Sequence, residues 1–142
     1  MLLDANILLY SVDEQSPFHP AAKVWMEEAL NGPRRVGIPW PSIAAFLRIV
    51  TNPRAVPNPL TTSDAWSIVE AWLDAPAVWV PQPGVGHRAI LGSLLQELDL
   101  RANLISDAAL AALCIEHGLT MVSADSDFAR FGAITWHNPV AR

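Results

Sequence analysis

The chain has 142 residues, of which 51% are hydrophobic and 16% are charged. This composition excludes an intrinsically disordered chain, and the length predicts a single domain spanning residues 1–142 with a sizeable core. The net charge of −5 means that overall charge would not draw the protein to nucleic acid.

Apolar patterns predict strands that alternate with helices, an order typical of βαβ units and a mostly parallel sheet. We therefore expect an α/β fold. The predicted elements in chain order are a strand at Met1–Ala5, a helix or turn at Ile7–Val12, a helix at Pro20–Leu30, a strand at Arg35–Ile38, a helix at Ser42–Val50, a loop at 52–60, a helix from Thr61 or Thr62 to Leu73, a strand at Val78–Pro81, helices at Val85–Leu98 and Ser106–His117, and strands at Leu119–Ser123 and Ala133–Trp136.

The cysteine count and the apolar runs bear on the compartment. A single cysteine, Cys114, excludes an internal disulfide and a zinc site built from cysteines. No apolar run approaches the roughly 18 residues of a membrane span, and the start MLLDANILLY lacks the basic region of a signal peptide. We expect a cytoplasmic protein with no membrane attachment.

Four aspartates stand where predicted strands end or a predicted helix begins. Asp4 follows Leu2 and Leu3, Asp107 falls in the first turn of the Ser106–His117 helix, and Asp125 and Asp127 follow the strand Leu119–Ser123. Ligands of open α/β sheets bind beyond the carboxyl ends of the strands. We expect the four acids to gather in one crevice.

Each acid also has a purely structural interpretation. Asp107 could stabilise a helix N-terminus through a cap bond and the dipole, and Asp125 and Asp127 could bond locally within a turn. Asp4 is harder to explain in this way, because a carboxylate in a buried apolar strand is costly unless it is paired or binds a metal.

Clustered carboxylates repel one another, and a pKa rises unless a cation neutralises them. Oxygen ligands without histidine or cysteine select Mg²⁺ or Mn²⁺. Such sites typically serve phosphoryl chemistry, in which the ion polarises the phosphate and activates a water.

Four segments together carry a resemblance to a known family. They are LLDANILLYSVDEQSPFH at the start, AFLRIVTNPR in the middle, LISDAALAALCIEHG, and VSADSDFARF near the end. Over essentially its whole length the chain resembles the PIN-domain family, and specifically the VapC-type ribonuclease toxins of bacterial toxin–antitoxin pairs. The resemblance implies an α/β/α sandwich, an endoribonuclease that uses Mg²⁺ or Mn²⁺, a homodimer, and a small antitoxin that blocks the site.

The resemblance also assigns roles to residues. Asp4, Asp107 and Asp125 match the family's metal-binding catalytic acids, and Asp127 matches an auxiliary acid. Two polar residues are implied as supports: Asn6 is the neighbour of Asp4, and Ser123 falls where the family often has Thr or Ser.

One position departs from the family pattern. The family typically has a Glu in the helix before the FLR segment, and Ala45 stands there in PSIAAFLR. No carboxylate occurs between Glu28 and Asp64 to replace it, although Asp127, Asp13 or Glu14 could do so from elsewhere. We expect weaker metal binding, because affinity rises with the number of charged ligands.

Two other functions stay open at this stage. A catalytically weakened RNA-binding or antitoxin-binding module would explain Ala45 as the mark of a decayed site. A phosphatase-like hydrolase that forms an aspartyl-phosphate on Asp4 is disfavoured, because it would need a second Asp where Asn6 stands.

Several further features have more than one interpretation. Arg48 and Arg54 could contact RNA phosphates or pair with acids, and the apolar face with Trp66 and Trp72 could be core, dimer surface or antitoxin surface. The segment Gly84–Ala89 imitates a dinucleotide fingerprint. Because Pro81 and Pro83 separate the preceding strand from this segment and its partner acid is missing, we expect no NAD site.

Overall fold

The computed structural model describes residues 1–141, and five short strands form a parallel sheet at its centre. The order across the sheet is β3-β2-β1-β4-β5, so the first strand of the chain is the middle one. Every strand pairs in parallel with its neighbours. The strands are β1 (Leu2–Leu3), β2 (Val36–Gly37), β3 (Val78–Trp79), β4 (Met121–Val122) and β5 (Trp136–His137).

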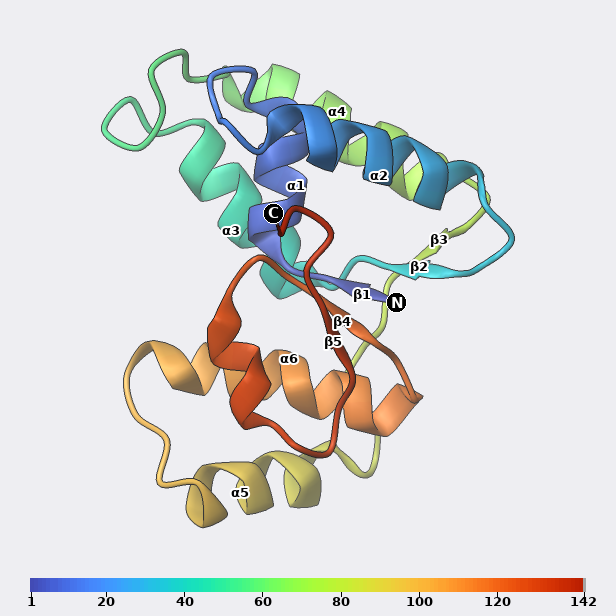
Figure 1. The fold of residues 1–142 in the computed structure, drawn as a ribbon, viewed down its shortest axis with the longest axis vertical. Coiled ribbons are helices and arrows are strands. Elements are labelled where there is room, and N and C mark those ends of the chain that lie inside the picture. Colours follow the sequence, from blue (N-terminus) through green and yellow to red (C-terminus); the bar gives the residue numbers. More distant parts are fainter. Residues whose placement is uncertain (142) are drawn as a thin grey trace.

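Helices cover both faces of this sheet. Figure 1 shows α1 to α4 on one side and α5 and α6 on the other, with the short 3-10 helix η1 beside α6. The helices are α1 (Ala5–Val12), α2 (His19–Asn31), α3 (Trp40–Val50), α4 (Thr62–Asp74), α5 (His87–Glu97), α6 (Asn103–His117) and η1 (Ser126–Arg130). No helix within residues 1–141 is long and apolar enough to cross a membrane.

The two faces of the sheet contribute to two separate cores. Successive side chains of a strand point to opposite faces, and the fully buried neighbours Leu2 and Leu3 in β1 do so. Leu3 packs with α1 to α4 around Phe46 and Val69, whereas Leu2 packs with α6 and η1 around Phe128. The result is the expected α/β/α sandwich, with an all-parallel sheet.

The structure also answers three questions that the sequence left open. The segment after Asp4 is a helix, not a turn, and Thr61 caps α4 by accepting a hydrogen bond from the Asp64 N–H. Trp72 is buried and lies 4.9 Å, centroid to centroid, from the ring of Phe46. Trp66 is 40% exposed. The apolar face of α4 is therefore core, and Trp66 lies at its edge.

Two expectations about the elements were wrong, and one element was not predicted. Helix α6 begins at Asn103 after Ala102, whose positive φ of 53° sets the start earlier than predicted, so Asp107 lies beyond the first turn. The strands are only two residues long because the chain enters a helix or loop directly after each one. The helix η1 after β4 was not predicted, since five residues with one large apolar side chain show little periodicity.

Candidate functional site

Asp4 lies where the central strand ends and α1 begins. Its backbone N–H donates to the carbonyl of Val122 in β4, and its carboxylate caps the helix, with Oδ1 accepting from the Ala5 N–H at 2.7 Å. Its place in the middle strand puts this carboxylate at the carboxyl edge of the sheet, beside the end of β4.

The Ser123 hydroxyl ties the two strand ends together. It donates to Asp4 Oδ2 at 2.6 Å, and it accepts from Asn6 Nδ2 at 3.1 Å and from the Asp125 N–H at 3.0 Å. Asn6 completes the network, because its Nδ2 also donates to Asp4 Oδ2 and its Oδ1 accepts from the Ala124 N–H. Ser123 is fully buried, so the structure places both predicted supporting residues against Asp4.

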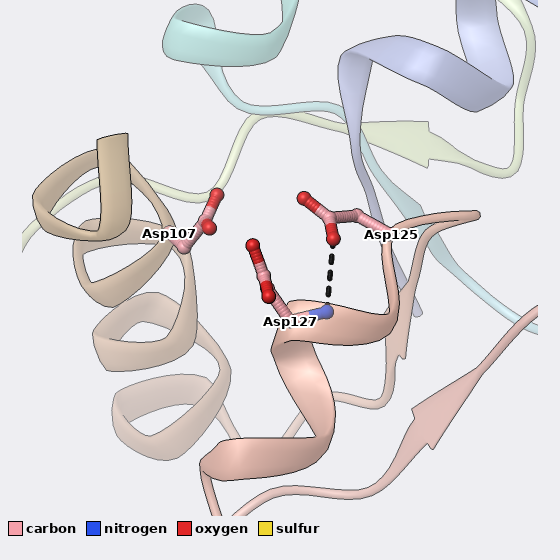
Figure 2. A group of neighbouring side chains, drawn as sticks. All are labelled: Asp107, Asp125 and Asp127. Atoms are coloured by element: carbon pink, nitrogen blue, oxygen red, sulfur yellow. Dashed lines mark hydrogen bonds between the residues drawn. The ribbon is translucent and has the colours of Figure 1, made fainter. Parts of the chain in front are cut away.

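The other three acids converge from α6 and η1. One carboxylate oxygen each of Asp107, Asp125 and Asp127 lie within 4.8 Å of one another, and Figure 2 shows the three side chains pointing toward a common space. Asp125 caps η1 by accepting the Asp127 N–H at 2.8 Å. Asp125 therefore both caps η1 and belongs to the acidic cluster.

Asp4 and Asp107 both line a hollow of about 370 Å³. Ala45 and Arg48 from α3 and Ser106 from α6 also line this hollow. Ala45, where the family typically has a Glu, therefore lines the same hollow as Asp4 and Asp107. Arg54 is not among the lining residues, and Asp13 and Glu14 line a different hollow beyond α1.

The pKa values of Asp107 and Asp4 are raised. Burial raises the pKa of Asp107 to about 6, with repulsion from Asp125, Asp4 and Asp127 adding to it. Burial also raises the pKa of Asp4, although the hydrogen bonds from Ser123 and Ala5 oppose this shift. The cluster therefore holds more negative charge than its own surroundings neutralise.

Arg130, a basic residue that the sequence did not single out, contacts the cluster. Arg130 Nη2 lies 3.1 Å from Asp127 Oδ1, and its charge lowers the pKa of Asp107. Arg130 follows Asp127 by three residues, a spacing that lets two side chains meet on a helix. The pair was not recognised because no helix was predicted there. Because Asp127 is exposed and already paired, it suits an auxiliary role better than a principal one.

This donor set fits a hard divalent cation. Three carboxylates with mutually close oxygens and an incompletely compensated charge are the ligands that Mg²⁺ and Mn²⁺ prefer. Asp4 already accepts three hydrogen bonds from the protein. A carboxylate has about four lone-pair sites, so roughly one is left to face the hollow.

Comparisons with known proteins identify the family. The pattern that defines the PIN domain matches residues 1–134. The chain is 41% identical to ribonuclease VapC37 of Mycobacterium tuberculosis, covering 99% of this chain and 97% of that one. It is 39% identical to ribonuclease VapC33 of the same species, with 96% of each chain covered.

Solved structures share the fold at low sequence identity. VapBC2 of Rickettsia felis, bound to a promoter DNA fragment, matches with a TM-score of 0.70 at 15% identity over 96% of each chain. VapC20 of Mycobacterium tuberculosis, described as a toxin that cleaves the sarcin–ricin loop, matches with a TM-score of 0.68 at 16% identity over 92% of this chain and 94% of that one. The chain belongs to the PIN-domain family and, within it, to the VapC ribonucleases.

Proposed function

We propose that this protein is the toxin of a toxin–antitoxin pair and an endoribonuclease that depends on Mg²⁺ or Mn²⁺. The observation that carries the proposal is the convergence of Asp107, Asp125 and Asp127 within 4.8 Å, with Asp4 on the same hollow as Asp107. A bound divalent ion would polarise the phosphodiester and lower the pKa of water at the site.

The residues divide the work between holding the ion and orienting its ligands. Asp4, Asp107 and Asp125 would be the principal ligands, and Asp127 would assist from the solvent side. Ser123 and Asn6 hold the Asp4 carboxylate in one orientation, as partners of metal ligands commonly do. Arg48 lines the hollow from α3, where its guanidinium would bind a phosphate oxygen of RNA. Arg54 remains a more distant candidate for RNA contact.

Ala45 favours weakened metal binding over lost activity. Its methyl group leaves the hollow open on the α3 side, and Mg²⁺ usually keeps several waters and few carboxylates. A non-catalytic RNA-binding or antitoxin-binding module is less well supported, because such a module would not need three mutually repelling carboxylates.

The partners follow from the same family membership. We propose that the substrate is RNA, that a small antitoxin covers the acidic hollow, and that two copies of the chain form a homodimer. A cytoplasmic location belongs to the same proposal, since RNA is the substrate and the single thiol, Cys114, is buried and free.

Removing one ligand should abolish RNA cleavage. Asp107→Asn keeps the size of the side chain but removes its charge, so purified antitoxin-free protein should no longer cut total cellular RNA in Mn²⁺. Ser123→Ala should lower the rate about 10- to 100-fold, because the Asp4 carboxylate loses its orienting partner. The measurement is cleavage with Mn²⁺, Mg²⁺ or chelator, with sequencing of the new ends.

Asp64→Asn is the matched control, because Asp64 is an exposed acid in the first turn of α4. It should cut like the wild type. Cleavage by Asp107→Asn at the wild-type rate, or cleavage by the wild type in chelator, would contradict the assigned site.

The metal-free protein should lose stability as pH rises from about 4 through 6. The folded state binds the Asp107 proton more tightly than the unfolded chain does, because its pKa is about 6. The stabilisation is therefore complete at low pH and disappears as the carboxyl ionises. We expect the loss to be roughly 1 kcal/mol, since solvent screens a partly exposed group.

Thermal unfolding of the wild type and Asp107→Asn between pH 4 and 7 measures this effect. The variant should show a smaller decline, and Mn²⁺ should restore the wild type at pH 7 by binding the ionised form. A wild-type curve that rises relative to the variant over this range would be incompatible with a raised pKa.

Ala45→Glu should strengthen metal binding. The new carboxylate would enter the hollow that Asp4 and Asp107 line, and we expect Mn²⁺ to bind about 10-fold more tightly because affinity rises with ligand charge. Calorimetric titration with Mn²⁺ measures the change. Ala71→Glu, on the exposed face of α4, is the control for added charge; equal gains in the two variants would show that position 45 does not reach the ion.

A further inference from the structure

A second hollow lies beside the acidic one, between the start of α3 and the side of α6. Its volume is about 110 Å³. Pro41 lines both hollows. A polymer that places a phosphate over the acids would therefore carry its neighbouring groups past this second hollow, which we call the slot.

Trp40 forms one side of the slot and is unusually exposed. It is the first residue of α3, and 46% of its surface is open to solvent, whereas Trp72 in the core is 8% exposed. An exposed indole beside a candidate active site offers a flat apolar face for a planar ring.

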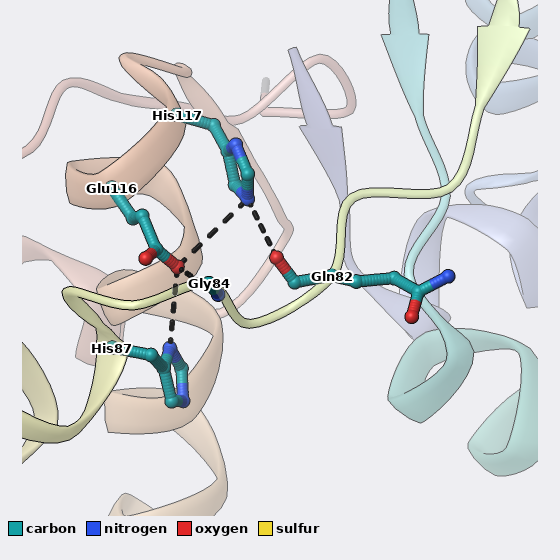
Figure 3. A network of polar contacts seen from close by, with 5 residues as sticks. All are labelled: Gln82, Gly84, His87, Glu116 and His117. Atoms are coloured by element: carbon teal, nitrogen blue, oxygen red, sulfur yellow. Dashed lines mark hydrogen bonds and ion pairs between the residues drawn. The ribbon is translucent and has the colours of Figure 1, made fainter.

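The chain segment 81–83 also lines the slot, and Glu116 and His117 hold this segment in place. Glu116 Oε1 accepts the Gly84 N–H at 2.9 Å, and His117 Nε2 lies 2.8 Å from the carbonyl oxygen of Gln82. Figure 3 shows these contacts reaching from the end of α6 to the segment. A Cβ at Gly84 would come within 2.8 Å of Glu116 Oε2, so a larger residue there would require the Glu116 carboxylate to shift.

The lining of the slot is planar or apolar and almost uncharged. Proline rings and the His87 imidazole stand near Trp40, and Ala109 and Leu113 of α6 complete the lining. Among these lining residues, His87 alone can carry a charge. Such a surface is unsuited to a phosphate or a metal ion and suited to the face of a neutral aromatic ring.

We propose that the slot binds one nucleobase of the RNA, unstacked from its neighbours, next to the bond that is cut, with Trp40 as its stacking platform. The proposal rests on the proposed function and adds a specificity-determining residue to it. Single-stranded RNA is commonly held in this way, by stacking of splayed bases on aromatic side chains. Because Glu116 and His117 already hold the segment that follows Pro81, little ordering is required when the base enters.

The test compares Trp40→Ala with Trp66→Ala, which removes another partly exposed tryptophan, on α4. The substrate is a 20-nucleotide RNA centred on a cut mapped with the wild type in total cellular RNA. Trp40→Ala should lower kcat/KM about 5- to 100-fold, mainly through KM. Trp40→Phe should retain most activity, and Trp66→Ala should match the wild type.

Abasic substrates identify the contact. Removing the base on one side of the cut should lower the wild-type kcat/KM by a similar factor and should add little to the effect of Trp40→Ala. Equal rates for the Trp40→Ala and Trp66→Ala variants, or fully additive effects of the abasic site and Trp40→Ala, would overturn the proposal. Wild-type cleavage that depends on metal would meanwhile leave the proposed function intact.

A binding measurement separates the two failures. Fluorescence anisotropy of a labelled single-stranded 20-mer RNA in chelator requires no catalysis, and Trp40→Ala should weaken binding while Trp66→Ala should not. Unchanged RNA affinity in Trp40→Ala would overturn the slot even if the wild type cuts no RNA. If Trp40→Ala weakened binding of the antitoxin but not of RNA, the proposal would also be overturned, because the slot would then be a protein contact. Circular dichroism confirms that each variant is folded.

Discussion

Mutual repulsion among carboxylates is the constraint around which this site is built. Asp107 has a pKa of about 6 because it is partly buried and faces Asp125, Asp4 and Asp127. A protein gains no stability from such an arrangement, since each ionised acid opposes the others. The acids stay close together because the backbones of three separate elements hold them in place. A divalent cation is the simplest species that would relieve the repulsion among them.

The order of the strands in the sheet brings the acids to one edge. Because β1 lies between β2 and β4, Asp4 lies beside the end of β4, and the Ser123 hydroxyl joins residues 119 positions apart in sequence. Helix α6 packs beside η1 and brings Asp107 to the same edge. Leu2 and Leu3 anchor the short strand β1 in the cores on both faces of the sheet.

The acids could be predicted from sequence for a physical reason. A carboxylate directly after a buried apolar pair is costly, and the carboxyl ends of parallel strands share one edge. That reasoning located Asp4 and Asp125. Helix α6 begins at Asn103, directly after Ala102, which has a positive φ. An alanine in the sequence gives no sign of a positive φ, so the start of this helix could not be predicted. Arg130 was missed for a related reason, since it reaches Asp127 only through η1.

Other parts of the site needed the tertiary structure. Ala45 was marked by resemblance to the family, and only the fold shows that it lines the same hollow as Asp4. Trp40 lies two residues before the predicted helix at Ser42–Val50, yet it begins α3 with nearly half of its surface exposed. Exposure of a tryptophan depends on neighbouring elements distant in the chain, so local periodicity does not predict it.

The most direct test of the account is the location of the ion. Crystals of the protein soaked in Mn²⁺ would be measured near the manganese absorption edge, and an anomalous difference map would be calculated. The account predicts a peak among the carboxylates of Asp107 and Asp125, within about 2.5 Å of their oxygens, on the side that Asp4 faces. Peaks only elsewhere on the surface, with the cluster empty and intact, would contradict it.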